Sequence, residues 1–158
     1  MSFRFKCAIA MFVFSCGVPG PVSAGPFEDG LHALEGGNYE RAMRLLRPLA
    51  AEGDARAQYQ IGVMHEEGWG VPRDYPEALG WLLRAADKGN ADAQNHLGFL
   101  YLYGRGVKKD YVTAYMWFDL AAADGAAHAA FSRDLVAANM TPSQVAVAHK
   151  LANDRKSK

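Results

Sequence analysis

The chain has 158 residues, 50% of them hydrophobic, and 17 basic residues balance 17 acidic ones. This composition is typical of a single folded domain and excludes a chain that is disordered throughout. The absence of net positive charge also argues against a nucleic-acid-binding protein, whose surface needs an excess of Lys and Arg.

Residues 1–24 have the features of an export signal. Two basic residues precede an apolar run over residues 7–18, and Val22-Ser23-Ala24 supplies the small residues expected before a cleavage site. We therefore expect cleavage directly after Ala24. An uncleaved membrane anchor is the weaker alternative, because spanning a bilayer takes roughly 20 apolar residues.

A lipid anchor on Cys16 is a second alternative for this segment. The preceding residues, Val13-Phe14-Ser15, fit the small-residue motif of bacterial lipoproteins poorly because of the Phe. Cleavage after Ala24 removes both cysteines of the sequence and leaves an exported domain that packing alone must stabilise.

Residues 25–53 are predicted to form a first, shorter pair of helices that caps the amino-terminal end of the stack. Residues 39–53 match the second half of each of the two longer units that follow, with Tyr39 and Gly53 in register. Only Gly36-Gly37-Asn38 separates them from the preceding helical segment, so we expect a shorter turn in this unit.

Residues 54–89 are predicted to form a helix over residues 54–67, a long turn, and a second helix over residues 75–88. Asp74 precedes the second helix and has Glu three residues after it, which is the spacing of a capping box. Gly89 follows that helix at a position where a left-handed backbone is common.

Residues 90–125 repeat this unit with a period of 36 residues and no gap. The identical pairs include Ala57/Ala93, Gln58/Gln94, Gly62/Gly98, Gly70/Gly106, Asp74/Asp110, Tyr75/Tyr111, Trp81/Trp117 and Gly89/Gly125. A fixed period of this length predicts a solenoid of stacked helical pairs. Glycine inside a helix costs about 1 kcal/mol relative to alanine, so we expect a neighbouring helix to approach closely at Gly62 and Gly98.

Residues 126–158 are predicted to close the stack and to end in a basic, solvated tail. A further copy starts at residues 126–138 but drifts from the pattern. Thr141-Pro142-Ser143-Gln144 has the sequence of a capping box, and the helix after it is expected to reach about Asn153. We expect Val145, Ala148 and Leu151 to point inward from this helix.

The repeated string A-x-A-Q-x-x-x-G, followed by G-x-G-V-x-x-D-Y-x-x-A-x-x-W-x-x-x-A-A-x-x-G, resembles the Sel1-like repeat, a relative of the tetratricopeptide repeat. Residues 57–89 and 93–125 carry it, with His65 where a Tyr is usual. The resemblance implies an all-α solenoid of about four helix pairs whose concave face binds proteins or peptides. Together with the export signal, it implies a periplasmic or secreted bacterial protein.

The sequence contains no pattern that predicts catalysis or metal binding. The turns at 68–71 and 104–107 are rich in glycine, but a helix rather than a strand precedes each, which argues against a phosphate-binding loop. No His-Glu-x-x-His or Gly-x-Ser-x-Gly motif is present. We expect no catalytic residue, metal or cofactor, and a packed structural role for His65.

Some members of the resembled family are connected with β-lactams, but those members carry a pair of cysteines in each repeat. The sequence after Ala24 has no cysteine. An envelope hydrolase or β-lactam-binding protein is therefore the alternative to a non-catalytic scaffold. Self-association through the open end of the stack is a third hypothesis.

The expected binding surface is the first helix of each pair, which lines the groove in tetratricopeptide geometry. Transferring that register gives Arg56, Tyr59, Val63, Glu66 and Glu67 in one repeat and Asp92, Asn95, Phe99, Leu102 and Tyr103 in the next. Aromatic residues among them would be natural anchors for a partner. The other possibility is that they pack beneath the end unit or the long turns. The expected partner is a protein or peptide of the cell envelope.

Overall fold

The structure is a computed structural model that describes residues 25–157, so the predicted export signal and Cys16 lie outside the described residues. This part of the chain folds into eight α-helices and no strands, which confirms the predicted all-α architecture. The helices are α1 (Pro26–Glu35), α2 (Tyr39–Glu52), α3 (Ala55–Glu67), α4 (Tyr75–Asp87), α5 (Ala91–Tyr103), α6 (Tyr111–Ala123), α7 (Ala129–Ala137) and α8 (Pro142–Lys156).

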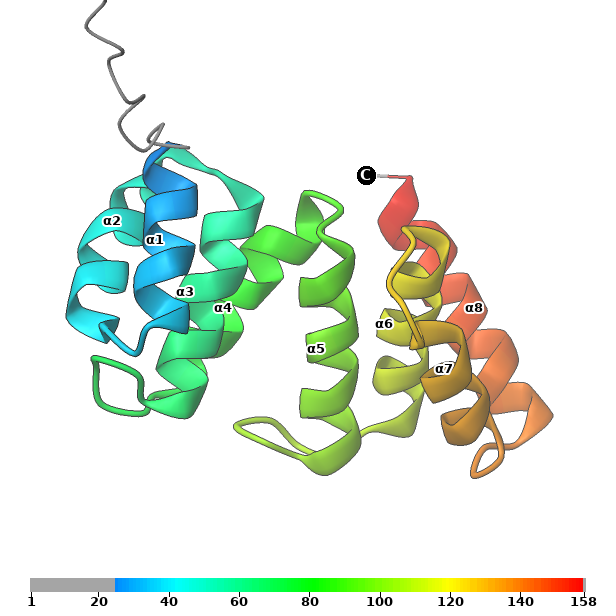
Figure 1. Cartoon of the computed structure of the whole chain (residues 1–158). Coiled ribbons are helices and arrows are strands. Elements are labelled where there is room, and N and C mark those ends of the chain that lie inside the picture. Colours follow the sequence, from blue (N-terminus) through cyan, green and yellow to red (C-terminus); the bar gives the residue numbers. More distant parts are fainter. Residues whose placement is uncertain (1–24, 158) are drawn as a thin grey trace, which may run out of the picture.

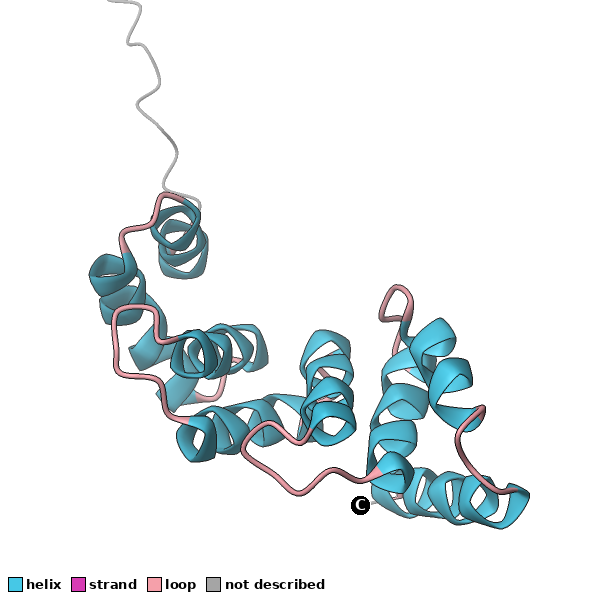
Figure 2. Cartoon of the chain, turned by 90° about the horizontal axis from the view of Figure 1, so that it is seen from below, coloured by secondary structure: helices cyan, strands magenta, loops and turns pink. Residues whose placement is uncertain are grey.

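The helices stack in chain order into a curved solenoid (Figures 1 and 2). Helices that follow one another in the chain pack together from α1 to α7, and α8 closes the stack by packing on α6. Seen along the stack in Figure 2, α1, α3, α5 and α7 lie on the inner side of the curve. None of the helices within residues 25–157 has the length and apolar character required to cross a membrane.

Side chains cap the beginning of six of the eight described helices. The carboxylate of Asp74 accepts a hydrogen bond from the backbone N–H of Glu77 at 3.0 Å, as its spacing predicts. Glu77 does not complete the capping box, because its carboxylate instead accepts from the indole N–H of Trp81 at 2.9 Å. The predicted box at Thr141 and Gln144 is complete, with both reciprocal bonds present.

The glycine-rich turns of the repeats lie over the preceding helical pair. Gly70 and Gly106 both have positive φ, and a Cβ at either would come within 3 Å of Tyr39 or Tyr75, the first residue of α2 or α4. Trp69, beside Gly70, stacks on the ring of Tyr39 with centroids 5.4 Å apart. The repeated Gly-x-Gly and Tyr therefore join successive pairs, which explains why they recur at a fixed period.

Close approach of helices at Gly62 and Gly98 is confirmed. A Cβ at Gly62 would lie 2.8 Å from Cγ of Leu82, and one at Gly98 would lie 2.6 Å from the ring of Phe118. Both Leu82 and Phe118 are fully buried, so the backbone of the first helix in each repeat packs directly on the core side chain of the second. Only glycine leaves room for this contact.

The repeated glutamines connect each pair to the one before it. The side-chain amide of Gln58 donates to the carbonyl of Ala50 at 3.0 Å, and that of Gln94 donates to Ala86 at 3.2 Å. Both amides are buried. Each carbonyl also accepts a hydrogen bond from a backbone N–H, that of Gly53 or Gly89, so the glutamine adds a second bond that connects one helical pair to the next.

The closing helix differs from expectation in two respects. It continues to Lys156 rather than ending near Asn153. The prediction that Leu151 points inward is wrong: Leu151 is 41% exposed, because the buried line of α8 runs through Ala148 and Ala152, four residues apart. Val145, also predicted to point inward, is half-buried against the core.

Candidate functional site

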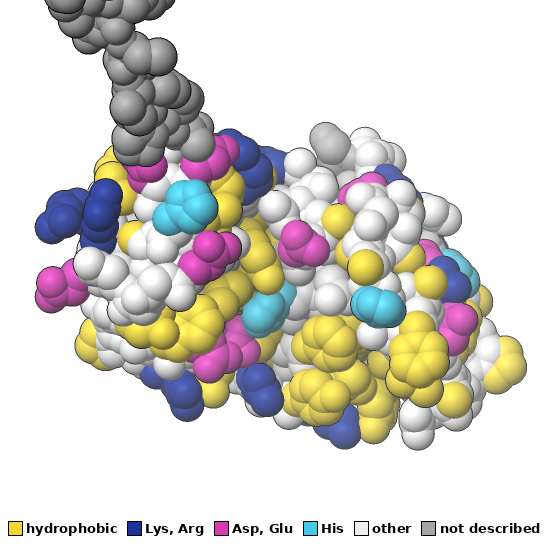
Figure 3. Space-filling view, in the orientation of Figure 1, with side chains coloured by type: hydrophobic (Ala, Val, Ile, Leu, Met, Phe, Trp, Pro, Cys, Tyr) yellow, Lys and Arg dark blue, Asp and Glu magenta, His cyan; other side chains and the backbone are white. Residues whose placement is uncertain are grey.

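The concave side of the solenoid is formed by α1, α3, α5 and α7 and is here called the inner face. Figure 3 shows it in the orientation of Figure 1, with hydrophobic side chains gathered over the end of α5 and continuing over α7. These helices bear the residues that the sequence predicts as partner-binding. The exposure and contacts of their side chains therefore determine which groups of the inner face a partner could contact.

The predicted residues divide into three groups by exposure. The exposed group consists of Arg56, Glu67, Asp92 and Tyr103. The half-buried group consists of Tyr59, Val63, Asn95, Phe99 and Leu102, and only Glu66 is buried. Tyr59, Phe99 and Leu102 contact the hydrophobic core with part of their surface. The expectation that Glu66 is exposed is wrong, since only 3% of its surface is accessible.

Two aromatic residues of α5 form an anchored, outward-facing pair. Phe99 and Tyr103 are stacked in parallel, with ring centroids 6.1 Å apart and an interplanar angle of 6°. Phe99 also meets the buried ring of Phe118 edge to face at 4.9 Å. Tyr103 is 61% exposed. Because Phe99 is fixed against the core, it holds the exposed Tyr103 ring in a defined position.

Glu66 is buried because it joins the two full repeats. Its carboxylate hydrogen-bonds to Nε2 of His96 on α5 and lies 3.5 Å from the guanidinium of Arg105 in the following turn. The ring of Tyr59 meets His96 edge-on at 6.0 Å. Burial tends to raise the pKa of the Glu66 carboxyl, but the hydrogen bond from His96 and the charges of His96 and Arg105 bring that pKa below its usual value. Glu66 therefore connects the two full repeats through its ion pairs and is not available to contact a partner.

The inner face extends further than the sequence analysis predicts. Phe131 and Leu135 on α7 are 65% and 56% exposed. They follow Asn95 and Phe99 by 36 residues, so they occupy the corresponding positions of the next unit. The signal that could have found them is the repeat period itself, carried one unit past the point where the rest of the pattern drifts.

A second polar cluster fastens the last two helices to α6. The hydroxyl of Tyr115 and Nε2 of His149 lie 3.1 Å apart, and Nδ1 of His149 lies 3.2 Å from the carboxylate of Asp119. Arg133 of α7 donates to the same carboxylate at 3.0 Å. Burial raises the pKa of the Tyr115 phenol, which disfavours the nucleophilic phenolate. These contacts join α7 and α8 to α6.

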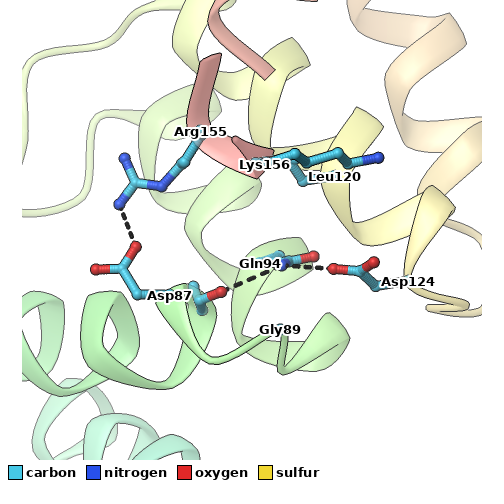
Figure 4. Close-up of a pocket in the computed structure, with 8 residues that line it drawn as sticks. Asp87, Gly89, Gln94, Leu120, Asp124, Arg155 and Lys156 are labelled. Atoms are coloured by element: carbon cyan, nitrogen blue, oxygen red, sulfur yellow. Dashed lines mark hydrogen bonds and ion pairs between the residues drawn. The ribbon is translucent and has the colours of Figure 1, made fainter. Parts of the chain in front are cut away.

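A cavity of about 520 Å³ lies where the end of α8 meets α4, α5 and α6 (Figure 4). Four of its polar side chains form two pairs. Arg155 donates to Asp87 at 2.6 Å, and Gln94 donates to Asp124 at 2.9 Å. The guanidinium of Arg155 also lies 4.3 Å from the centre of the Trp117 ring. Arg155 thus ties α8 to α4 and is not part of a purely solvated tail.

Histidine and carboxylate side chains do not gather into a metal centre in the part of the chain that the structure describes. Within residues 25–157, no three of His, Cys, Asp and Glu come together in a group that could hold a metal ion. His65, predicted to serve packing, is half-buried, and its Nδ1 is buried without a hydrogen-bond partner.

Comparison with known structures shows the same fold in two bacterial proteins. The first is a protective antigen present in uropathogenic Escherichia coli strains, described as having an SLR fold; it is 30% identical over 84% of this chain, with a TM-score of 0.79. The second is a Sel1 repeat protein from Oxalobacter formigenes, 32% identical over 72% of the chain, with a TM-score of 0.67. The chain spans 29% and 46% of the length of these two proteins. A comparison with curated proteins gives no match.

The model of the Sel1 repeat matches the sequence three times, at residues 27–54, 55–90 and 91–125. The first match shows that the shorter amino-terminal pair is a repeat in its own right. Sel1 repeats are typically scaffolds for protein–protein interaction and are generally not catalytic. The three matches cover more than half of the chain, which therefore belongs to the Sel1 repeat family.

Proposed function

We propose that this protein is an exported, non-catalytic scaffold that binds a protein or peptide of the cell envelope on its inner face. The observation that carries the proposal is the Tyr103 ring, 61% exposed yet stacked on Phe99, which is itself fixed against Phe118. An aromatic side chain held in place before binding loses little conformational entropy when a partner covers it. Export is supported by the signal-like pattern of residues 1–24.

The size of the inner face sets the expected strength of binding. It spans four helices of only 9 to 13 residues each. A surface of this extent suits a peptide segment or a small domain edge, for which affinities in the micromolar range are usual. A few aromatic residues are then expected to contribute most of the binding free energy.

Replacing Tyr103 by Ser is expected to weaken partner retention about tenfold, because the loss of one central aromatic anchor typically costs more than 1 kcal/mol of binding free energy. The measurement is affinity capture from envelope extract on immobilised protein, followed by titration of the captured partner. Phe99 is left intact, since its contact with Phe118 contributes to the core.

Leu151→Ser is the matched control. Leu151 is 41% exposed but lies on α8, outside the inner face. Equal retention by the wild type and Leu151→Ser, with loss in Tyr103→Ser, supports the proposal. A partner that Tyr103→Ser retains and Leu151→Ser loses would place binding on another surface and refute it.

A further inference from the structure

Charge is distributed unequally between the inner and outer helices of the solenoid. The four inner helices carry seven Asp or Glu residues, two Arg residues and no Lys. The outer helices α2, α4, α6 and α8 carry six acidic residues and seven basic ones. The inner helices therefore carry an excess of negative charge. Arg105, in the turn after α5, lies 5.7 Å from the centre of the Tyr103 ring and pairs with Glu66 at 3.5 Å.

Both arginines of the inner helices are already engaged by carboxylates. Arg56 pairs with Asp54 at 2.9 Å and lies 3.7 Å from Glu28. Arg133 pairs with Asp119 and Asp134, each at 3.0 Å. Neither guanidinium is free to meet an acidic partner.

Two exposed carboxylates of the inner face remain available. Within residues 25–157, the side chains of Glu67, at the end of α3, and Asp92, at the start of α5, take part in no hydrogen bond or ion pair. Glu66, next to Glu67, is neutralised by His96 and Arg105. Glu67 lies at the same end of its helix as Tyr103, which follows it by one repeat of 36 residues, whereas Asp92 lies at the other end of α5.

The apolar part of the face runs across three inner helices. It comprises Tyr59 on α3, Phe99 and Tyr103 on α5, and Phe131 and Leu135 on α7, here called the apolar strip. Tyr103, Phe131 and Leu135 are the three most exposed large hydrophobic side chains of the described chain. The strip suits a ligand that presents several apolar side chains at once.

We propose that the ligand of the inner face is a cationic, amphipathic peptide segment. Its aromatic or aliphatic side chains contact the apolar strip, and its Lys or Arg side chains pair with Glu67 and Asp92. Complementary charge of this kind selects among partners and speeds their encounter more than it adds affinity. This inference rests on the proposed binding function and specifies the chemistry of the partner.

The test is selection of a random dodecapeptide phage library on the purified protein, followed by fluorescence titration of the enriched peptides. We expect enriched peptides to combine net positive charge with two or more aromatic or aliphatic residues. Glu67→Gln/Asp92→Asn should weaken the best peptide about threefold to tenfold and reduce the dependence of binding on salt. Phe131→Ser/Leu135→Ser should weaken it about tenfold at any salt concentration.

Val147→Ser, a 50% exposed position on α8, is the control that should bind as the wild type does. Circular dichroism checks that each variant folds, which is expected because every changed side chain is exposed. Neutral or acidic peptides that still require Phe131 and Leu135 would refute the cationic ligand and leave the binding function standing. Selected peptides that bind all variants equally would refute both.

Discussion

Gly98→Val is expected to lower the free energy of unfolding by about 3 kcal/mol, the upper part of the range for overpacked cores. A Cβ at position 98 would lie 2.6 to 2.8 Å from three atoms of the Phe118 ring, which is fully buried. The ring has no space to retreat, since Phe99 packs against it edge to face. Urea unfolding followed by circular dichroism measures the loss.

Gly80→Ala, which also replaces a glycine inside a helix, is expected to raise the free energy of unfolding. A Cβ at Gly80 would meet nothing within 4 Å. Removing a glycine from an open helix position should therefore stabilise the protein by about 0.4 to 1 kcal/mol. If Gly98→Val left stability unchanged, α5 and α6 would not pack as closely as the structure shows.

His96→Ala is expected to cost about 2 to 3 kcal/mol near neutral pH, because it leaves the buried Glu66 carboxylate with Arg105 alone. Glu66→Gln should cost less. The partners that it would leave unpaired, His96 and Arg105, have side chains 25% and 56% exposed and are accessible to water. Unfolding free energies of the three proteins at one pH establish this order.

The pH dependence of these variants has a defined sign. The folded-state pKa of Glu66 is lowered from 4.5, so its stabilising contribution is present above that pH and is lost as pH falls through the folded pKa. The stability difference between wild type and Glu66→Gln should therefore shrink in acid. Protonation of Glu66 also removes the charge that His96 stabilises, so the cost of His96→Ala should shrink in acid as well. A cost that stayed constant down to pH 3 would contradict the proposed ion pair.

The fold follows from the sequence because its determinants are local and periodic. Caps such as Asp74 and Thr141 act within three residues, and the glycines at 62 and 98 recur in the same place in each unit. A period of 36 residues then dictates that each unit packs on the next as the previous one did. For the same reason, the contact of Gly98 with Phe118 corresponds to that of Gly62 with Leu82.

The burial of Glu66 could not be predicted in this way, because its partners are not part of the repeat. Gln60 and Trp69 occupy the positions in the first full repeat that His96 and Arg105 occupy in the second. Comparing the repeats therefore shows only that these two positions vary. The ion pair depends on two side chains at least 30 residues away, which meet Glu66 only once α3 and α5 are stacked.

The end of the stack was the least predictable part of the site. Drift of the pattern after Gly125 suggested a cap, whereas α7 keeps Phe131 and Leu135 exposed on the inner face. Helix α8 does not follow the repeat, so nothing local indicated that Arg155 would pair with Asp87, 68 residues earlier. Long-range pairs of this kind follow from the assembled stack and not from spacing in the sequence.

Site-specific photo-crosslinking in living cells tests the central claim most directly. A photoreactive phenylalanine analogue replaces Tyr103 on the inner face in one strain and Val147 on α8 in another; the two positions are 61% and 50% exposed. The account predicts a discrete adduct with an envelope protein or peptide from position 103 and none from position 147. Adducts from position 147 alone, or from neither position, would contradict binding on the inner face.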